Sequence, residues 1–227
     1  MARWGMVIDL ERCNGCQACE VACRAENNIP VGGPDAAREN RTISWMQVVT
    51  EVHGEWPEVH TRFIPRPCMH CDRPPCTAVC PVEATSIDRE GIVGQVYPRC
   101  IGCRYCANAC PYTVKSFNWK KPSYPKSSEP MLNPDVSTRP AGVIEKCTFC
   151  HHRLQRARDQ ARAEGRPLRE SDYVPACAES CPTGAIVFGD LDDPRHRVAR
   201  LVKAPRAFRL LEELGTKPKV YYLAEER

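Results

Sequence analysis

The chain has 227 residues, which suits one compact domain or two small ones, and its hydrophobic content of 42% includes all 16 cysteines. With a mean hydropathy of -0.46 the aliphatic core is modest, so something besides apolar packing has to hold the fold together. The net charge of +4 is mild and spread along the chain, which argues against a nucleic-acid-binding surface.

No apolar run approaches the roughly 18 residues of a membrane span. The N-terminal "MARWGMVIDLERC" has an apolar stretch that stops at Asp9, which is too short for a signal peptide. We therefore expect neither a direct membrane span nor an export signal on this chain.

The predicted elements follow one another as short strands, loops and short helices. Strand-like runs stand before each group of cysteines, as "GMVIDL", "TRFIP", "GIVGQVY" and "AGVIE". Residues 27–62 begin with loop signals and predict a hairpin of "TISWMQVVTEV" and "EVHTRFI" that turns at "HGEWP". Residues 118–141 are too rich in proline for regular structure. A charged helix, "RLQRARDQARAEG", is predicted to end at Gly165, and the tail predicts a helix around "RAFRLLEELG" and a last strand "KVYYL".

The sixteen cysteines fall into four groups of four. Group one is Cys13, Cys16, Cys19 and Cys23; group two is Cys68, Cys71, Cys76 and Cys80; group three is Cys100, Cys103, Cys106 and Cys110; group four is Cys147, Cys150, Cys177 and Cys181. Disulfides are disfavoured because the chain lacks an export signal and thiols two residues apart pair poorly. Structural zinc is the stronger alternative, but zinc sites stop at four ligands and do not use this spacing. Three cysteines two residues apart, then one three residues later and often a proline, are the bacterial ferredoxin pattern for [4Fe–4S] clusters.

In that pattern the fourth cysteine of one group binds the neighbouring cluster. Few residues separate Cys80 from Cys100, so groups two and three form one compact pair, and groups one and four form the other. The predicted ligand sets are Cys68, Cys71, Cys76 and Cys110; Cys100, Cys103, Cys106 and Cys80; Cys13, Cys16, Cys19 and Cys181; and Cys147, Cys150, Cys177 and Cys23. Sixteen ligands predict four [4Fe–4S] clusters as cofactors, with iron bound through these same cysteines.

The recurring phrases "CPVEATSI" and "CPTGAIVF" indicate an internal repeat. We therefore predict an α+β fold of duplicated bacterial-ferredoxin-like modules, each a 2×[4Fe–4S] unit, with loop and hairpin insertions. Residues 1–26 and 142–190 form the outer module, and 63–117 form the inner module. Residues 27–62 are the hairpin insertion, 118–141 the Pro-rich loop and 191–227 the C-terminal tail.

Outside the cysteines the sequence contains no catalytic constellation, neither a nucleotide-binding loop nor a nucleophile motif. His70, His151 and His152 stand beside cysteines, but every cluster already has four thiolates, so we expect these histidines to donate hydrogen bonds or face solvent. The pattern predicts a non-catalytic electron-transfer protein.

The phrases "MVIDLERCNGCQACEVAC", "CMHCDRPPCTAVCPVEAT", "RCIGCRYCANACPY", "KCTFCHHRL", "PACAESCPTGAIVFGDLDDP" and "ELGTKPKVYYL" cover nearly the whole chain. They resemble the four-cluster iron–sulfur subunit of complex iron–sulfur molybdoenzymes, the group of polysulfide, thiosulfate, tetrathionate and dimethyl sulfoxide reductases and of sulfite dehydrogenases. The resemblance implies a subunit that relays electrons between a molybdopterin-containing catalytic subunit and an integral membrane quinone-binding anchor. Some relatives replace a group-three cysteine and hold a three-iron cluster there, whereas Cys103 is intact here, so we expect four cubanes.

The resemblance also implies that groups one and four lie on the molybdenum side and groups two and three on the quinone side. It implies a peripheral position on the cytoplasmic membrane through partner subunits, and it leaves the membrane face undecided while favouring the periplasmic side by co-export. Two alternatives stay open: a relay for a formate dehydrogenase-like or quinol-oxidising respiratory complex, and, more remotely, a zinc-stabilised interaction scaffold.

Overall fold

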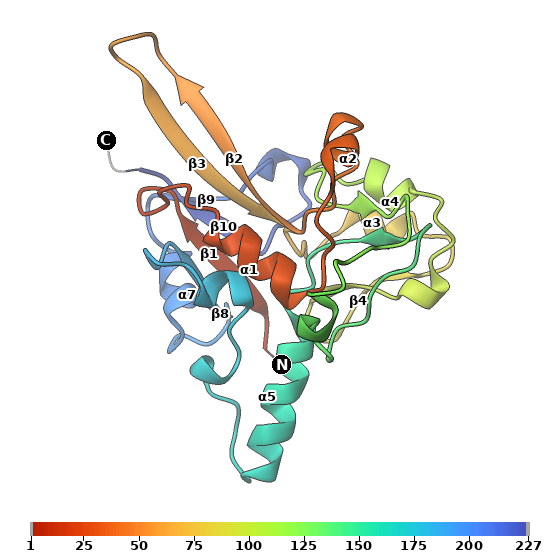
Figure 1. The fold of residues 1–227 in the computed structure, drawn as a ribbon. Coiled ribbons are helices and arrows are strands. Elements are labelled where there is room, and N and C mark those ends of the chain that lie inside the picture. The colour runs from red at the N-terminus through yellow and green to blue at the C-terminus, as the bar shows by residue number, and fades with distance from the viewer. Residues whose placement is uncertain (1, 226–227) are drawn as a thin grey trace.

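The computed structural model describes residues 2–225 of the chain (Figure 1). Its centre is a four-stranded sheet in the order β8 (Ile186–Asp190), β1 (Trp4–Asp9), β10 (Val220–Leu223) and β9 (Ala207–Phe208). Strand β1 pairs antiparallel with β8 and parallel with β10. The first and last strands of the chain therefore lie side by side in one sheet.

All six residues of β1 are buried because both faces of the sheet are covered. Successive side chains of a strand point to opposite faces. On one face Val7 packs with Leu191 and with Val198 of α7 (Arg197–Leu201). On the other face Met6 and Ile8 belong to the main core, which also contains many of the cysteines. The sheet thus supports the cysteine-rich part of the molecule on one side only.

Three two-stranded sheets and six further helices complete the regular structure of residues 2–225. The two-stranded sheets are β2 (Met46–His53) with β3 (His60–Pro67), β4 (Thr85–Ile87) with β5 (Val93–Gln95), and β6 (Ser116–Phe117) with β7 (Ile144–Glu145). The helices are α1 (Ala18–Glu26), α2 (Pro34–Arg38), α3 (Pro75–Ala78), α4 (Tyr105–Asn108), α5 (His151–Ala163) and α6 (Ala176–Glu179). Single 3₁₀ turns cover Tyr97–Arg99, Glu129–Met131, Glu170–Asp172 and Glu212–Leu214. Within these residues no helix has the length and apolar character that a bilayer span requires.

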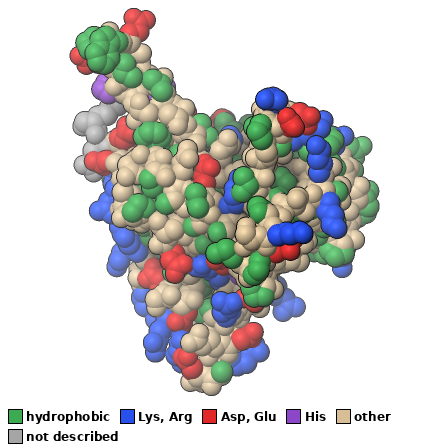
Figure 2. Space-filling view, in the orientation of Figure 1, with side chains coloured by type: hydrophobic (Ala, Val, Ile, Leu, Met, Phe, Trp, Pro, Cys, Tyr) green, Lys and Arg blue, Asp and Glu red, His purple; other side chains and the backbone are tan. Residues whose placement is uncertain are grey.

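The predicted insertion hairpin is confirmed as β2 and β3, which extend from the body of the molecule as a narrow arm (Figure 1). The base of the arm is buried and its far end is exposed. At the turn the Trp56 side chain is 89% exposed, and Figure 2 shows hydrophobic side chains gathered at this tip.

The predicted charged helix is confirmed as α5, which begins earlier than expected, at His151, and ends at Ala163. Gly165 follows in the left-handed region with φ +63°, where glycine has no steric penalty and helices commonly end.

The predicted helix around residues 206–215 is wrong. Ala207 and Phe208 form β9, which pairs with β10, and the Phe208 ring lies 5.7 Å from that of Tyr222. Leu211 then adopts φ +49°, which no helix tolerates, and only the 3₁₀ turn Glu212–Leu214 follows. The strand partner comes from later in the chain, and pairing with it outweighs the local helical preference of this segment.

Arg139 ties the Pro-rich segment 118–141 to the rest of the fold. Its guanidinium is buried and makes an ion pair of 3.0 Å with Glu145, which also accepts a hydrogen bond from Trp45. It donates two more hydrogen bonds to the carbonyls of Asn27 and Asn28 at the end of α1. One side chain therefore joins three segments, and a buried pair of this kind is costly to break because the remaining charge stays buried.

We predict that Arg139→Met lowers the free energy of unfolding by about 3 kcal/mol, because Glu145 is left buried without its cation. The measurement is anaerobic guanidinium unfolding of the cluster-loaded chain. Arg38→Met is the matched control, because Arg38 pairs with Asp35 on the surface, and it should change the same quantity by no more than about 0.5 kcal/mol. Equal losses of unfolding free energy in the two variants would contradict the stabilising role of the buried Arg139–Glu145 pair.

Candidate iron–sulfur cluster sites

Three cavities of the structure are each lined by four cysteines. Site A is lined by Cys13, Cys16, Cys19 and Cys181; site C by Cys68, Cys71, Cys76 and Cys110; site D by Cys80, Cys100, Cys103 and Cys106. The atom-free space in sites A, C and D is about 310, 330 and 270 Å³. In each cavity three cysteines come from one group and the fourth from the other group of the predicted pair. The structure thus brings these twelve cysteines together in the predicted sets.

The remaining four cysteines, Cys23, Cys147, Cys150 and Cys177, are all buried and form site B. Burial raises the pKa of Cys23 well above its usual range, and the thiols of the other three raise it further, which places all four close together. The Asn27 side-chain amide lies 3.7 Å from Cys23 Sγ and 3.8 Å from Cys150 Sγ. Asn27 is a polar neighbour of this site that the cysteine spacing does not reveal.

A left-handed residue stands directly before the second cysteine of every group. These residues are Gly15, His70, Gly102 and Phe149, with φ of 71°, 43°, 72° and 55°. The left-handed conformation turns the chain sharply, so that the flanking cysteines face one cavity. At Gly15 no larger residue fits, because a Cβ atom there would lie 2.5 Å from the Phe63 ring. Gln17 and Arg104 repeat the conformation before α1 and α4, so groups one and three have the same loop.

The electrostatics of the four sites fit a positively charged iron cluster. Burial raises the pKa of Cys19, Cys71 and Cys147 to about 12, so bare thiolates are disfavoured there. Backbone N–H groups also point at cysteine sulfur atoms. Phe149 N lies 3.4 Å from Cys147 Sγ, and Thr85 N lies 3.5 Å from Cys80 Sγ. Iron ligation supplies the positive charge that deprotonated, buried thiols need, and metal binding to such sites releases protons.

A single zinc ion fits the same residues poorly. Zinc is held by four ligands that converge on one point at about 2.3 Å from sulfur. Across residues 2–225, which include all sixteen cysteines, no three His, Cys, Asp or Glu side chains converge in that way. In sites A, C and D the four cysteines instead line a cavity. All sixteen are also free of disulfides.

The four sites follow one another in the order A, B, C and D. Cys19 of site A acts electrostatically on Cys23 and Cys177 of site B, and Cys68 of site C acts on Cys147 of site B. Helices α3 and α4 pack together and connect sites C and D. Of the sixteen cysteines only Cys16 and Cys103 are exposed, and they belong to the two end sites.

The rings of His70 and Phe149 stack at the junction of sites B and C, with centroids 3.7 Å apart. His70 is fully buried, and its Nδ1 accepts a hydrogen bond of 3.1 Å from the Val93 N–H. His152 instead lies 2.6 Å from Glu26, and His151 lies 3.9 Å from Asp88. None of these three histidines lines the cavities of sites A, C or D. His70 is therefore a packing residue between two sites rather than the solvent-facing group that the sequence allowed.

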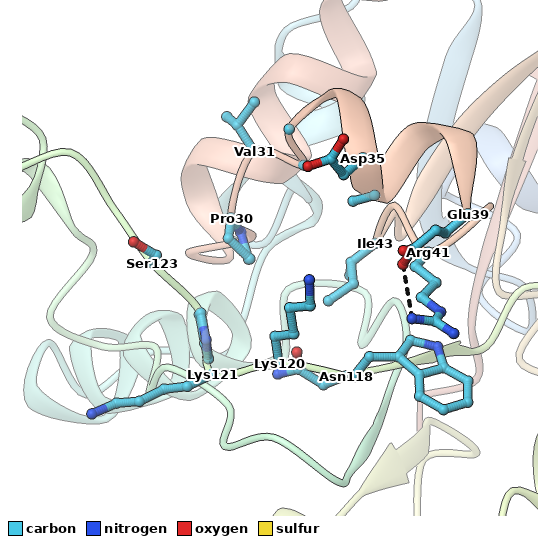
Figure 3. Close-up of a pocket in the computed structure, with 15 residues that line it drawn as sticks. Pro30, Val31, Asp35, Glu39, Arg41, Ile43, Asn118, Lys120, Lys121 and Ser123 are labelled. Atoms are coloured by element: carbon cyan, nitrogen blue, oxygen red, sulfur yellow. Dashed lines mark hydrogen bonds and ion pairs between the residues drawn. The ribbon is translucent and has the colours of Figure 1, made fainter.

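A further cavity, with about 870 Å³ of atom-free space, lies between α2 and residues 118–123 and is lined by no cysteine (Figure 3). Figure 3 shows the Lys120 side chain reaching into it, while Arg41 at its edge pairs with Glu39 at 2.8 Å. Trp119 at the same edge lies between the guanidinium groups of Arg41 and Arg104. Side chains of both charge signs line this cavity, with three cations (Arg41, Lys120 and Lys121) and two anions (Asp35 and Glu39).

Comparison with known proteins places the chain in a family. Residues 59–131 match one 4Fe-4S dicluster domain family, and residues 12–84 and 99–185 match another. The chain is 56% identical over 98% of its length to the iron–sulfur cluster-binding subunit of a menaquinone reductase from Nitratidesulfovibrio vulgaris, 89% of which is covered. It is 39% identical over 97% of its length to a tetrathionate reductase subunit of Salmonella typhimurium, with 72% of that protein covered. It is 36% identical to an iron–sulfur subunit of an Hdr-like menaquinol oxidoreductase from Archaeoglobus fulgidus, over 97% of this chain and 82% of that one.

The chain belongs to the family of iron–sulfur subunits of molybdoenzyme reductases. Within that family it is an electron-transfer subunit with ferredoxin-like dicluster domains and four [4Fe–4S] clusters. The predicted family, general function and cofactors are thereby confirmed.

We expect about sixteen iron atoms and about sixteen acid-labile sulfides per chain after anaerobic purification. The protein should be brown and should bleach with dithionite, whereas a zinc protein is colourless. Iron near half of that value, accompanied by a matching amount of zinc, would show that some of the four sites hold zinc instead.

Proposed function

We propose that the sixteen cysteines hold four clusters at sites A to D and that these relay electrons from one end of the series to the other. The observation that carries the proposal is the exposure pattern, in which only the end sites present an exposed cysteine. When bound, a [4Fe–4S] cluster takes up and gives back one electron. The chain's own residues position the clusters in sequence and shield the two middle sites from solvent. Cys16 and Cys103 remain exposed at the two ends.

The two ends face different surroundings. Site A is covered in part by Val48 and Pro65 at the base of the hairpin arm. Site D is flanked by Ile101 and Tyr105, which are 64% and 61% exposed. Different surfaces at the two ends suit two different partner subunits. We infer that a molybdopterin-containing catalytic subunit contacts the site A end and that an integral membrane quinone-binding subunit contacts the site D end.

We further propose that the chain is built of two two-cluster modules. The outer module combines residues 1–26 with 142–190, where α1 packs on α6 and β1 pairs with β8. The inner module covers residues 63–117, where α3 packs on α4. Strand β7 before group four pairs with β6 after group three, so the two modules share a two-stranded sheet.

The second candidate function is a relay for a quinol-oxidising respiratory complex of another type. It is favoured by the relative named as a subunit of an Hdr-like menaquinol oxidoreductase. Purification of the intact complex decides between the two, because a molybdopterin cofactor in the co-purifying subunit supports the first and its absence supports the second.

We expect Cys103→Ser to weaken the cluster at site D and to convert it in part to a three-iron form. The three-iron form gives a new electron paramagnetic resonance signal in the oxidised state. Electron exchange with quinone should then fall, while exchange between the catalytic partner and a soluble dye coupled to that subunit should persist. Cys16→Ser is the matched variant at the exposed cysteine of site A. It should also lower electron exchange with quinone, because every electron crosses the whole series, and it should leave the dye exchange at the catalytic subunit intact. Equal loss of both activities in Cys103→Ser would contradict the placement of site D at the quinone end.

We expect the chain to be peripheral, held at the cytoplasmic membrane by its partners and carried to the periplasmic side with a signal-bearing partner. Protease treatment of intact spheroplasts tests the face. Cleavage without lysis supports the periplasmic side, and a chain that is cut only after lysis is cytoplasmic.

A further inference from the structure

One position of the cysteine repeat carries a different side chain at each of three sites. Each of these sites takes its fourth cysteine from the other group of the pair: Cys181 at site A, Cys110 at site C and Cys80 at site D. The residue five places after that cysteine lines the same cavity. The residue is Ile186 at site A, Lys115 at site C and Thr85 at site D. Equivalent backbone positions thus present an alkyl group, an ammonium and a hydroxyl.

The Lys115 ammonium lies between sites C and D. Lys115 lines site C, and its Nζ donates hydrogen bonds to Thr85 Oγ1 at 3.3 Å and to Gln95 Oε1 at 3.5 Å, both of which line site D. Within residues 2–225 no carboxylate forms an ion pair with it. Its charge is therefore not cancelled locally.

A second ammonium, that of Lys146, contacts residues of site C and site B. Lys146 is fully buried, and its Nζ donates hydrogen bonds to the carbonyls of Val93 and Cys147, the latter at 2.7 Å. Val93 lines site C, and Cys147 belongs to site B. Lys146 also has no ion pair with a carboxylate in the described part of the chain.

Site A has a charged neighbour of the opposite sign. Val48 lines site A, and its N–H donates a hydrogen bond to the Glu20 carboxylate. Ammonium groups thus lie beside site C, whereas a carboxylate lies beside site A.

We propose that Lys115 is a tuning residue that raises the midpoint potential of the cluster at site C, with Lys146 acting in the same direction from the side of site B. The inference rests on the ligand sets proposed above. Reduction adds one negative charge to a cluster, and a nearby ammonium stabilises the reduced form more than the oxidised form. The third cluster of the series is then easier to reduce than the first, and an electron that enters at site A is held at site C before it reaches site D.

The test is a potentiometric titration of the cluster-loaded chain followed by electron paramagnetic resonance. Lys115→Gln removes the charge and keeps a hydrogen-bond donor. We expect the equilibrium constant for reduction of the cluster at site C to fall about tenfold, which is 59 mV for a one-electron couple. Lys115→Arg keeps the charge and should leave the potential unchanged. The shifted signal should be the one that changes in a Cys71→Ser variant, and the signal of site A should stay in place.

Lys115→Thr, which copies the residue of site D, gives the same measurement if Lys115→Gln fails to assemble its clusters. If these variants keep all four cluster signals and show no shift in midpoint potential, Lys115 does not tune the cluster at site C. The proposed electron relay would not be affected by that result. A shift of equal size in Lys115→Arg would also overturn it, because the charge would not be the cause. A native chain with fewer than four cluster signals would instead contradict the proposed function itself.

Discussion

The structure depends on the burial of thiols that have to lose their protons. Cys19, Cys23, Cys68, Cys71, Cys147 and Cys177 belong to the main hydrophobic core beside Met6 and Ile8. In a cluster-free chain the low-dielectric surroundings favour neutral thiols, and burial accordingly raises the pKa of Cys19, Cys23 and Cys71. Iron compensates the negative charge of the thiolates, so the free energy of cluster binding becomes free energy of folding. A chain with a modest aliphatic core can therefore fold compactly around four inorganic groups.

The same turn stands before the second cysteine of each of the four groups. The residue at its left-handed position is glycine at the two end sites and a larger residue at the two central sites. Gly15 and Gly102 occupy it in the groups that contribute the exposed cysteines of end sites A and D. His70 and Phe149 occupy it in the two central sites. A non-glycine residue in this conformation costs roughly 1–2 kcal/mol. The stacked, buried rings offset that cost, because they fill the junction between sites B and C and join the two halves of the molecule.

Much of this arrangement could be predicted because it is local in the sequence. The cysteine spacing indicates which thiols can share a cavity, and the short apolar runs "GMVIDL", "TRFIP" and "KVYYL" identify β1, β3 and β10. Non-local pairing was beyond such reasoning. The segment that contains Phe208 has helical preferences, yet it forms β9 because β10 offers a strand edge. The stacking of His70 on Phe149 depends on two loops far apart in the chain. Lys115 could have been found by aligning the residues after Cys80, Cys110 and Cys181, because only one of the three sequences has a cation at that place.

The placement of exposed and buried cysteines also suits electron transfer along the molecule. All four cysteines of site B and three of the four at site C are buried, so the potentials of clusters bound there would respond strongly to fixed charges such as the Lys146 ammonium. Clusters bound at sites A and D, which have the two exposed cysteines, would respond less, because water screens nearby charges, but a partner could approach them closely. Fixed charges of this protein can therefore set the midpoint potentials most effectively at the two central sites. The ends are where exchange with other subunits takes place, and there the docked partner, by excluding water, would complete the surroundings of the cluster.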